Sequence, residues 1–124
     1  MIKIEDLPKS VPIFPLSNFI FFPNTSAPLN IFEPRYIAMI DQCMKSNRLL
    51  GMAQPKRITG NKIPELFDVG CLGKISSFNE TDDGRYIIIL NGITRFNISK
   101  EIENNKAFRE FEINFNSFEN DTTD

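Results

Sequence analysis

The chain has 124 residues, a length typical of one domain with one hydrophobic core. Its 14 basic and 16 acidic residues give a formal net charge of -2, so there is no global positive field to collect phosphate backbones, which argues against nucleic acid as a partner. Histidine is absent, and this removes the commonest general base and the commonest metal ligand.

The first part of the chain predicts short strands. A polar lead-in covers residues 1–10, and the first apolar run covers 11–16. Prolines at 12 and 15 cannot donate ladder hydrogen bonds, so we expect this strand at a sheet edge or beside a bulge. A second apolar run, Phe19-Ile-Phe-Phe22, ends at a Pro-Asn turn signal and precedes a strand candidate over 27–31.

One substantial helix is predicted over about 34–46. Pro34 suits the first helical position, and the Ser-Asn pair at 46–47 can end the helix. The apolar residues between them recur at the spacing of one helix face: Tyr36, Met39, Ile40, Cys43 and Met44. Cys43 and Cys71 lack the paired spacing of a zinc site, so we interpret both as small buried hydrophobes.

The rest of the chain predicts β-structure. A short strand over 49–53 leads into a flexible loop over 54–65, which is rich in Gly, Pro, Lys and Arg. Further strands are expected over 69–78, 86–90, 93–102 and 108–115. Asp83-Gly84, between two of these strands, is the strongest hairpin signal, because Gly adopts the positive φ that a tight turn needs.

These elements define the expected organisation. Several strands, one helix and short turns predict a mainly β fold, a closed or nearly closed barrel with a helix over one end. The acidic, unpatterned end of the chain predicts disorder. We therefore divide the chain into a lead-in over 1–10, a domain over 11–117 and a disordered acidic tail over 118–124.

The sequence offers no catalytic constellation. Gly73-Lys-Ile-Ser76 lacks the upstream glycine spacing of a phosphate-binding loop and lies within a strand. Lys74 and Ser76 share a strand face, but such pairs arise by chance in most proteins. Asp82-Asp83 fits a hairpin turn better than a calcium loop. We predict no catalytic residue, no cofactor, no metal and no enzymatic activity.

Hydrophobic surface is what remains for function. In a run of four large apolar residues, a two-sided strand must point some toward the core and some away. One interpretation is burial on both faces of a barrel wall; the other is an exposed patch that catches unfolded chains. In the second case the candidate protein-binding residues are Phe19, Phe21 and Phe22, with the loop at 54–65 as a further possibility.

Several blocks of the sequence carry a family resemblance, in order, from about residue 11 to 115. They are Pro12-Ile-Phe-Pro-Leu16, Phe22-Pro23, Pro28-Leu-Asn-Ile-Phe-Glu-Pro-Arg-Tyr36, Val69-Gly-Cys-Leu-Gly-Lys-Ile75, Asp83-Gly-Arg85 and Gly92-Ile-Thr-Arg-Phe96. Together they resemble the N-terminal, substrate-binding domain of Lon proteases. The Ile-Phe-Glu-Pro-Arg-Tyr block is the most specific.

The resemblance implies a PUA-like β-barrel of about six strands with one helix. It also implies a non-catalytic module that recognises unfolded or hydrophobic protein segments, with unfolded or partly folded proteins and protease components as partners. In full Lon proteases this domain is joined to an ATPase and a Ser–Lys protease, which are missing here. The chain is then either a stand-alone Lon-domain protein or a fragment of a larger ATP-dependent protease.

For the motif residues we expect structural roles. They are Glu33, Pro34, Arg35, Tyr36, Asp83, Gly84, Arg85, Gly92, Arg95 and Phe96. One hypothesis is that Arg35 and Arg95 pair with Glu33 or Asp83 and so fix the helix against the barrel.

Two further expectations concern location and an alternative ligand. The beginning of the chain has no apolar signal segment and the longest aliphatic run, 87–90, is too short to span a bilayer, so we expect a cytoplasmic protein that does not enter membranes. PUA-like barrels often hold RNA, and a contiguous basic groove would favour that alternative. Its candidate residues are Lys56, Arg57, Lys62 and Arg85.

Overall fold

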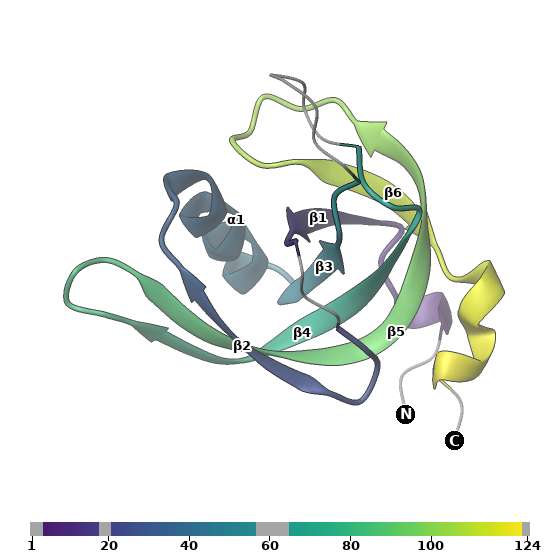
Figure 1. Cartoon of the computed structure of the whole chain (residues 1–124), viewed down its shortest axis with the longest axis horizontal. Helices are drawn as coiled ribbons and strands as arrows, with labels where there is room; N and C mark the ends of the chain where they lie inside the picture. The colour runs from purple at the N-terminus through teal and green to yellow at the C-terminus, as the bar shows by residue number, and fades with distance from the viewer. Residues whose placement is uncertain (1–3, 18–20, 57–64, 123–124) are drawn as a thin grey trace.

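The computed structural model describes residues 4–17, 21–56 and 65–122. Within them six strands curl into one sheet, with a helix on the concave side of the long hairpin (Figure 1). The strands are β1 (Ser10–Pro15), β2 (Ser26–Ile31), β3 (Leu49–Ala53), β4 (Val69–Glu80), β5 (Tyr86–Ile102) and β6 (Glu110–Asn114). The helices are the α-helix α1 (Pro34–Lys45) and two 3-10 segments, η1 (Ile4–Asp6) and η2 (Asn116–Thr122).

The sheet closes on itself. Its order is β2-β5-β4-β3-β1-β6, and β6 also pairs with β5, so β5, β4, β3, β1 and β6 form a ring that β2 extends at one side. Every pairing is antiparallel except that of β1 with β3. The predicted mainly β fold of about six strands with one helix is confirmed.

The sequence predicts β1 at a sheet edge or beside a bulge, but in the structure β1 lies between β3 and β6 in the strand order. Residues 10–12 pair with β6, whereas residues 13–15 pair with β3. Each half of the strand therefore has one partner, and Pro12 and Pro15 each occupy a half whose other side is not in a ladder. A proline without an N–H is tolerated in such a position.

β5 is one continuous strand where the sequence predicts two. Asn91, between the two predicted strands, pairs with Ser26 of β2 and Lys74 of β4, so ladders on both sides carry the backbone straight through this point. The strand is continuous but not regular: the pairing of β4 with β5 shifts register between Leu72 and Gly73 and between Ile75 and Ser77.

The core forms two clusters. One packs α1 against the sheet and includes four residues of the predicted stripe, Tyr36, Met39, Ile40 and Cys43; the fifth, Met44, is half-buried and packs against the cluster. The other is built from strand residues and their flanking segments around Phe96, which is fully buried. Gly70 is required there, because a Cβ at this position would lie 2.6 Å from the Phe96 ring. Both cysteines are buried and unpaired, as predicted.

Most of the segment predicted as a disordered tail, 118–124, lies in the described part of the chain. Residues 116–122 form η2, which lies beside β5 (Figure 1). A pairing that composition cannot show joins the two elements: the Asp121 carboxylate is held by Arg95 of β5. Among the described helices, none combines the length and apolar character needed to cross a membrane.

Candidate protein-binding site

An open apolar pocket of about 340 Å³ lies where four segments of the chain meet. The segment after β1, the end of β3, the start of β4 and the middle of β5 all contribute. Its lining residues are Leu16, Phe21, Phe22, Met52, Ala53, Gln54, Phe67, Val69, Gly70, Cys71 and Arg95. This set is almost entirely apolar, as expected of a site that removes apolar surface of a ligand from water.

Phe22 forms one wall of the pocket and is 55% exposed. A tight turn holds it in this position: the Thr25 hydroxyl and the Thr25 N–H both donate to the Phe22 carbonyl, at 2.7 and 3.3 Å. Asn24 adopts a positive φ of 63° within this turn. The exposed ring therefore stands on a backbone whose polar groups are satisfied.

Two backbone hydrogen bonds join this turn to β5. The Asn24 N–H donates to the Gly92 carbonyl at 2.9 Å, and the Gly92 N–H donates to the Thr25 carbonyl at 2.8 Å. A Cβ at position 92 would lie 2.1 Å from the Phe22 carbonyl oxygen, so only glycine permits this approach. Gly92 therefore sets the position from which Phe22 reaches the pocket.

Phe67 and Val69 also line the pocket, and they are 49% and 44% exposed. The Phe67 N–H donates to the Gln54 carbonyl at 2.9 Å, and an isolated bridge joins residues 55 and 66. In this extended segment alternate side chains face opposite ways, so Leu66 packs into the core while Phe67 and Val69 face outward. The exposure of Phe67 is thus fixed by the burial of its neighbour.

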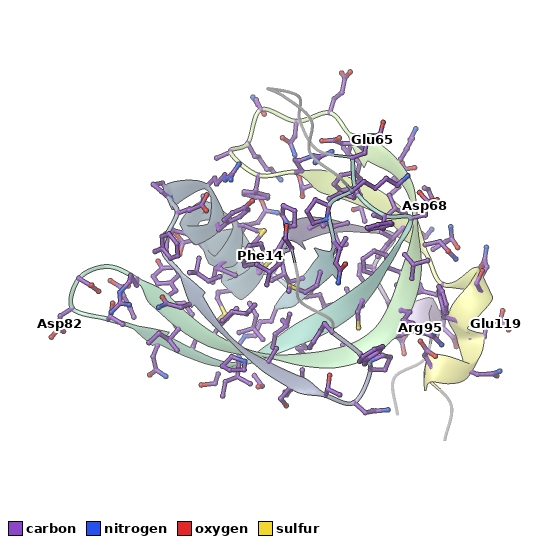
Figure 2. All side chains as sticks on the ribbon, in the orientation of Figure 1. Phe14, Glu65, Asp68, Asp82, Arg95 and Glu119 are labelled. Carbon is purple, nitrogen blue, oxygen red and sulfur yellow. The ribbon has the colours of Figure 1, made fainter. Side chains whose placement is uncertain are left out.

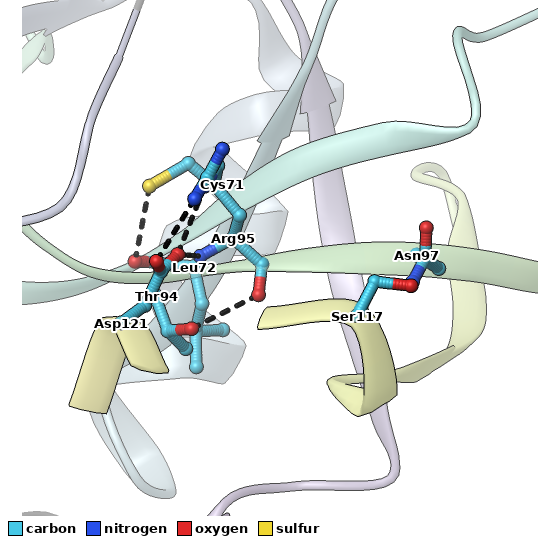
Figure 3. Close-up of polar contacts among 7 residues, drawn as sticks. All are labelled: Cys71, Leu72, Thr94, Arg95, Asn97, Ser117 and Asp121. Atoms are coloured by element: carbon cyan, nitrogen blue, oxygen red, sulfur yellow. Dashed lines mark hydrogen bonds and ion pairs between the residues drawn. The ribbon is translucent and has the colours of Figure 1, made fainter. Parts of the chain in front are cut away.

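Arg95 is the charged member of the lining. It is held through a bidentate pair with Asp121 of η2: its Nε and Nη2 atoms donate to the two carboxylate oxygens at 2.9 and 3.0 Å (Figure 3). The Arg95 backbone N–H donates to the same carboxylate at 3.0 Å. These hydrogen bonds hold the pKa of Asp121 below its ordinary value, and they raise that of Arg95.

Cys71 lines the pocket and is buried, but it is not equipped as a nucleophile. Burial raises the pKa of its thiol to about 12, so the thiol is protonated at neutral pH. Lys74 and Ser76 lie further along β4. The Ser76 hydroxyl donates to the Ile89 carbonyl at 3.4 Å, so in the structure its hydrogen bond goes to the backbone and not to Lys74. Within the described ranges, no group of three or more acidic or cysteine side chains is placed to hold a metal ion.

The three phenylalanines predicted from sequence have different places. Phe22 is exposed and lines the pocket, whereas Phe21 lines the pocket but is buried and belongs to the core cluster that contains the α1 residues. Phe19 lies outside the described residues. Of the second candidate, the loop at 54–65, the described ends pair with each other through Lys56 and Glu65, and residues 57–64 lie outside the described part.

Sequence reasoning missed Phe67 and Val69. An exposed apolar residue on a short extended segment looks the same in sequence as a buried one, and only the inward side chain of Leu66 decides the phase. The available signal was the alternation of side chains along an extended segment, in which 66 and 70 share one face and 67 and 69 the other. It becomes informative once Leu66 and Gly70 are known to be buried.

The motif residues occupy the ends of elements. Glu33 and Arg35 pair at 2.9 Å at the start of α1, but both are exposed and neighbouring, so this pair does not connect the helix to the barrel. Arg95 pairs with Asp121 and not with Glu33 or Asp83, which corrects that part of the hypothesis. The helix is joined to β5 instead by the Tyr86 hydroxyl, which donates to Asp41 at 2.7 Å.

The other motif residues lie in the β4–β5 turn or in the core. Gly84 adopts a φ of 86°, as the predicted turn requires, and Arg85 pairs with Asp83 beside it at 3.0 Å. Pro34 occupies the start of α1, while Tyr36 and Phe96 are buried.

The predicted basic groove is not assembled by its described members. The Lys56 N–H bonds to Glu65, whereas Arg85 lies in the turn that contains Asp82. Figure 2 shows Asp82 at the far left of the molecule and Glu65 well apart from it, at the top. Arg57 and Lys62 lie outside the described residues.

Comparison with solved structures defines the class of fold. A Lon N-terminal domain protein from Xanthomonas campestris superposes with a TM-score of 0.66, at 23% identity, over 84% of this chain and 57% of that one. The N-terminal domain of a Lon protease of the Mycobacterium avium complex superposes with a TM-score of 0.64, at 21% identity, over 85% of this chain and 53% of the other. The fold is that of a Lon N-terminal domain.

Sequence comparison then shows the family. The Lon protease of Desulfosudis oleivorans is 34% identical over 94 residues, 73% of this chain and 12% of the relative. Lon protease 1 of Bdellovibrio bacteriovorus is 33% identical over 87 residues, 68% of this chain and 11% of the relative. Residues 10–124 match the ATP-dependent protease La (LON) substrate-binding domain, and the chain belongs to this family. It thus spans only a small part of the curated proteases that it matches.

Proposed function

We propose that this chain is a non-catalytic protein-binding module that takes up apolar side chains of unfolded or partly folded proteins in the pocket between Phe22 and Phe67. The observation that carries the proposal is the exposure of three large apolar side chains, Phe22, Phe67 and Val69, at one pocket. Exposed apolar surface that is concentrated and rigidly held is typical of an interaction site.

The family supports a polypeptide as the ligand. The matched family is named for substrate binding within a protease, and the substrates of a protease are proteins. The relatives are whole proteases, of which this chain spans about an eighth. In this proposal the chain binds the polypeptide, and peptide and nucleotide hydrolysis belong to other parts of such proteases.

The size of the pocket supports an unfolded ligand. At about 340 Å³ it is at the small end of the range for ligand pockets, enough for one or two side chains and not for a folded surface. A folded protein buries most of its large apolar side chains, whereas an unfolded chain exposes them. Such a module binds many sequences weakly.

The two unpaired, buried cysteines suit a reducing compartment, and we place the module in the cytoplasm.

The test is a titration of a fluorescently labelled, permanently unfolded protein with wild type and with Phe22→Ser and Phe67→Ser. Each substitution removes one pocket wall and should weaken binding about tenfold, the effect of losing a contact worth about 1.4 kcal/mol. Phe32→Ser is the matched control, because Phe32 is 65% exposed and does not line the pocket.

Two results would contradict the proposal. One is the absence of binding to the unfolded protein by wild type at high micromolar concentration. The other is an equal loss in all three variants, which would mean that general surface hydrophobicity, and not this pocket, is responsible. Retention of RNA that weakens steeply with salt would point instead to the PUA-like alternative.

A further inference from the structure

Arg95, which lines the pocket, also holds a carboxylate of its own chain, that of Asp121. Arg95 supplies three donors to this carboxylate: its Nε and Nη2 atoms and its backbone N–H, all at 2.9 to 3.0 Å (Figure 3). The Asp121 side chain is only 11% exposed in this position. A guanidinium fork with a third N–H beside it matches the shape of a carboxylate, whichever chain supplies it.

Arg95 belongs to the pocket and to this cradle at the same time. It lines the pocket, and its partner in the β4–β5 ladder is Cys71, which also lines the pocket. The ring of Phe118 in η2 stacks on the guanidinium at 4.5 Å from the ring centroid, which fixes the plane of the fork. An acidic side chain next to an apolar residue in the pocket would therefore meet Arg95.

Asp121 is delivered by a small element outside both core clusters. η2 is a short 3-10 segment whose side chains at 116, 117, 119 and 120 are exposed. Its polar contacts with the barrel include those of Ser117 with Asn97 at 3.1 Å and of Asn116 with Asn114 at 3.3 Å. Elements with few buried contacts open at low free-energy cost. A ligand can therefore compete for the cradle without unfolding the barrel.

We infer that Arg95 is a specificity-determining residue of the pocket for acidic side chains of the bound segment, and that Asp121 is the intramolecular competitor that suppresses this preference. The inference rests on the proposed function. An aspartate that belongs to the same chain competes at a high effective concentration, on the order of millimolar. The wild-type chain therefore binds apolar segments with little regard to a neighbouring acid, and removal of the competitor reveals a preference for acidic ones.

The test uses the full chain and two peptides that differ in one residue. Both carry the same apolar core and an amidated C-terminus; one has Asp and the other Asn beside the core. We expect near-equal affinities for wild type, and about tenfold tighter binding of the Asp peptide by Asp121→Asn, as for one charge-assisted contact. In the double variant Arg95→Gln/Asp121→Asn this preference should disappear. Asp83→Asn, which breaks the Asp83–Arg85 pair in the β4–β5 turn, is the control and should behave as wild type.

Two outcomes would overturn the inference: equal affinity of Asp121→Asn for both peptides, or a preference that persists without Arg95. A merely structural pair between Arg95 and Asp121 predicts lower stability and no gain in preference. A second readout works even if neither peptide binds. The NMR signal of the Arg95 Nε–H in Asp121→Asn should return toward its wild-type position on addition of N-acetyl-aspartate amide. An unmoved signal would exclude the carboxylate site independently of the proposed function.

Discussion

Gly92 is the residue on which the exposed ring of Phe22 most depends. It exchanges hydrogen bonds with the Asn24 N–H and the Thr25 carbonyl, and it leaves no room for a side chain beneath the Phe22 carbonyl. The pocket wall is thus positioned by a residue that does not itself line the pocket.

Gly92→Ala should therefore lower both stability and affinity. The added methyl group would lie 2.1 Å from the Phe22 carbonyl oxygen, so the turn must move. We expect a loss of about 1–3 kcal/mol in the free energy of unfolding, as for other overpacked positions, measured by urea denaturation. Binding of an unfolded protein should weaken in the same variant under folding conditions.

Gly84→Ala is the matched control. It is strained by its φ of 86°, but a Cβ there would meet nothing within 4 Å, and the residue lies in the β4–β5 turn. It should cost about 1 kcal/mol of stability and leave binding unchanged. If Gly92→Ala kept wild-type affinity, the hydrogen bonds of β5 with the Phe22 turn would not position the ring as described.

At the scale of elements, η2 is held to β5 by a pair whose strength depends on pH. The Arg95 hydrogen bonds hold the pKa of Asp121 below its ordinary value of 3.8. A carboxyl group whose pKa is lowered by folding stabilises the folded state above its unfolded pKa, and this contribution is lost as the pH falls through the folded pKa.

The difference in unfolding free energy between wild type and Asp121→Asn should therefore be constant at neutral pH and shrink below pH 3.8. Urea denaturation across this range measures it. Arg95→Gln should show the same convergence, and the double variant should be no less stable than the less stable single variant. A gap that does not depend on pH would mean that the carboxylate charge does not hold η2.

Most elements could be predicted from sequence because their signals are local. α1 follows from Pro34 and a helical apolar stripe, and the β4–β5 turn follows from Asp83-Gly84. The misjudged elements depend on distant partners. β5 continues past Asn91 because β2 and β4 pair with it there. η2 lies against β5 because Asp121 pairs with Arg95, a partner 26 residues away in sequence that no local pattern indicates.

At the scale of the whole molecule, the pairing of β3, β4 and β5 creates the pocket. Phe22, Met52, Val69 and Arg95 are far apart in sequence. They meet because Met52 pairs with Cys71 and Cys71 with Arg95 across these three strands, and because Gly92 of β5 holds the turn after Phe22. Sequence reasoning could select Phe22 as an apolar candidate, but it could not show that Phe67 lines the same pocket. The family resemblance indicated the fold and a class of ligand, whereas the position of the site needed the structure.

The most direct test of this account is to map the binding surface by NMR while an unfolded protein is added to the isotope-labelled chain. We predict that the perturbed signals belong to the pocket, with Met52, Val69, Gly70 and Cys71 among the most affected. Ile87 and Ile89, which are also exposed apolar residues but lie outside the pocket lining, should be unaffected. Perturbations confined to the outer face of the β4–β5 hairpin, with the pocket signals unmoved, would contradict the account.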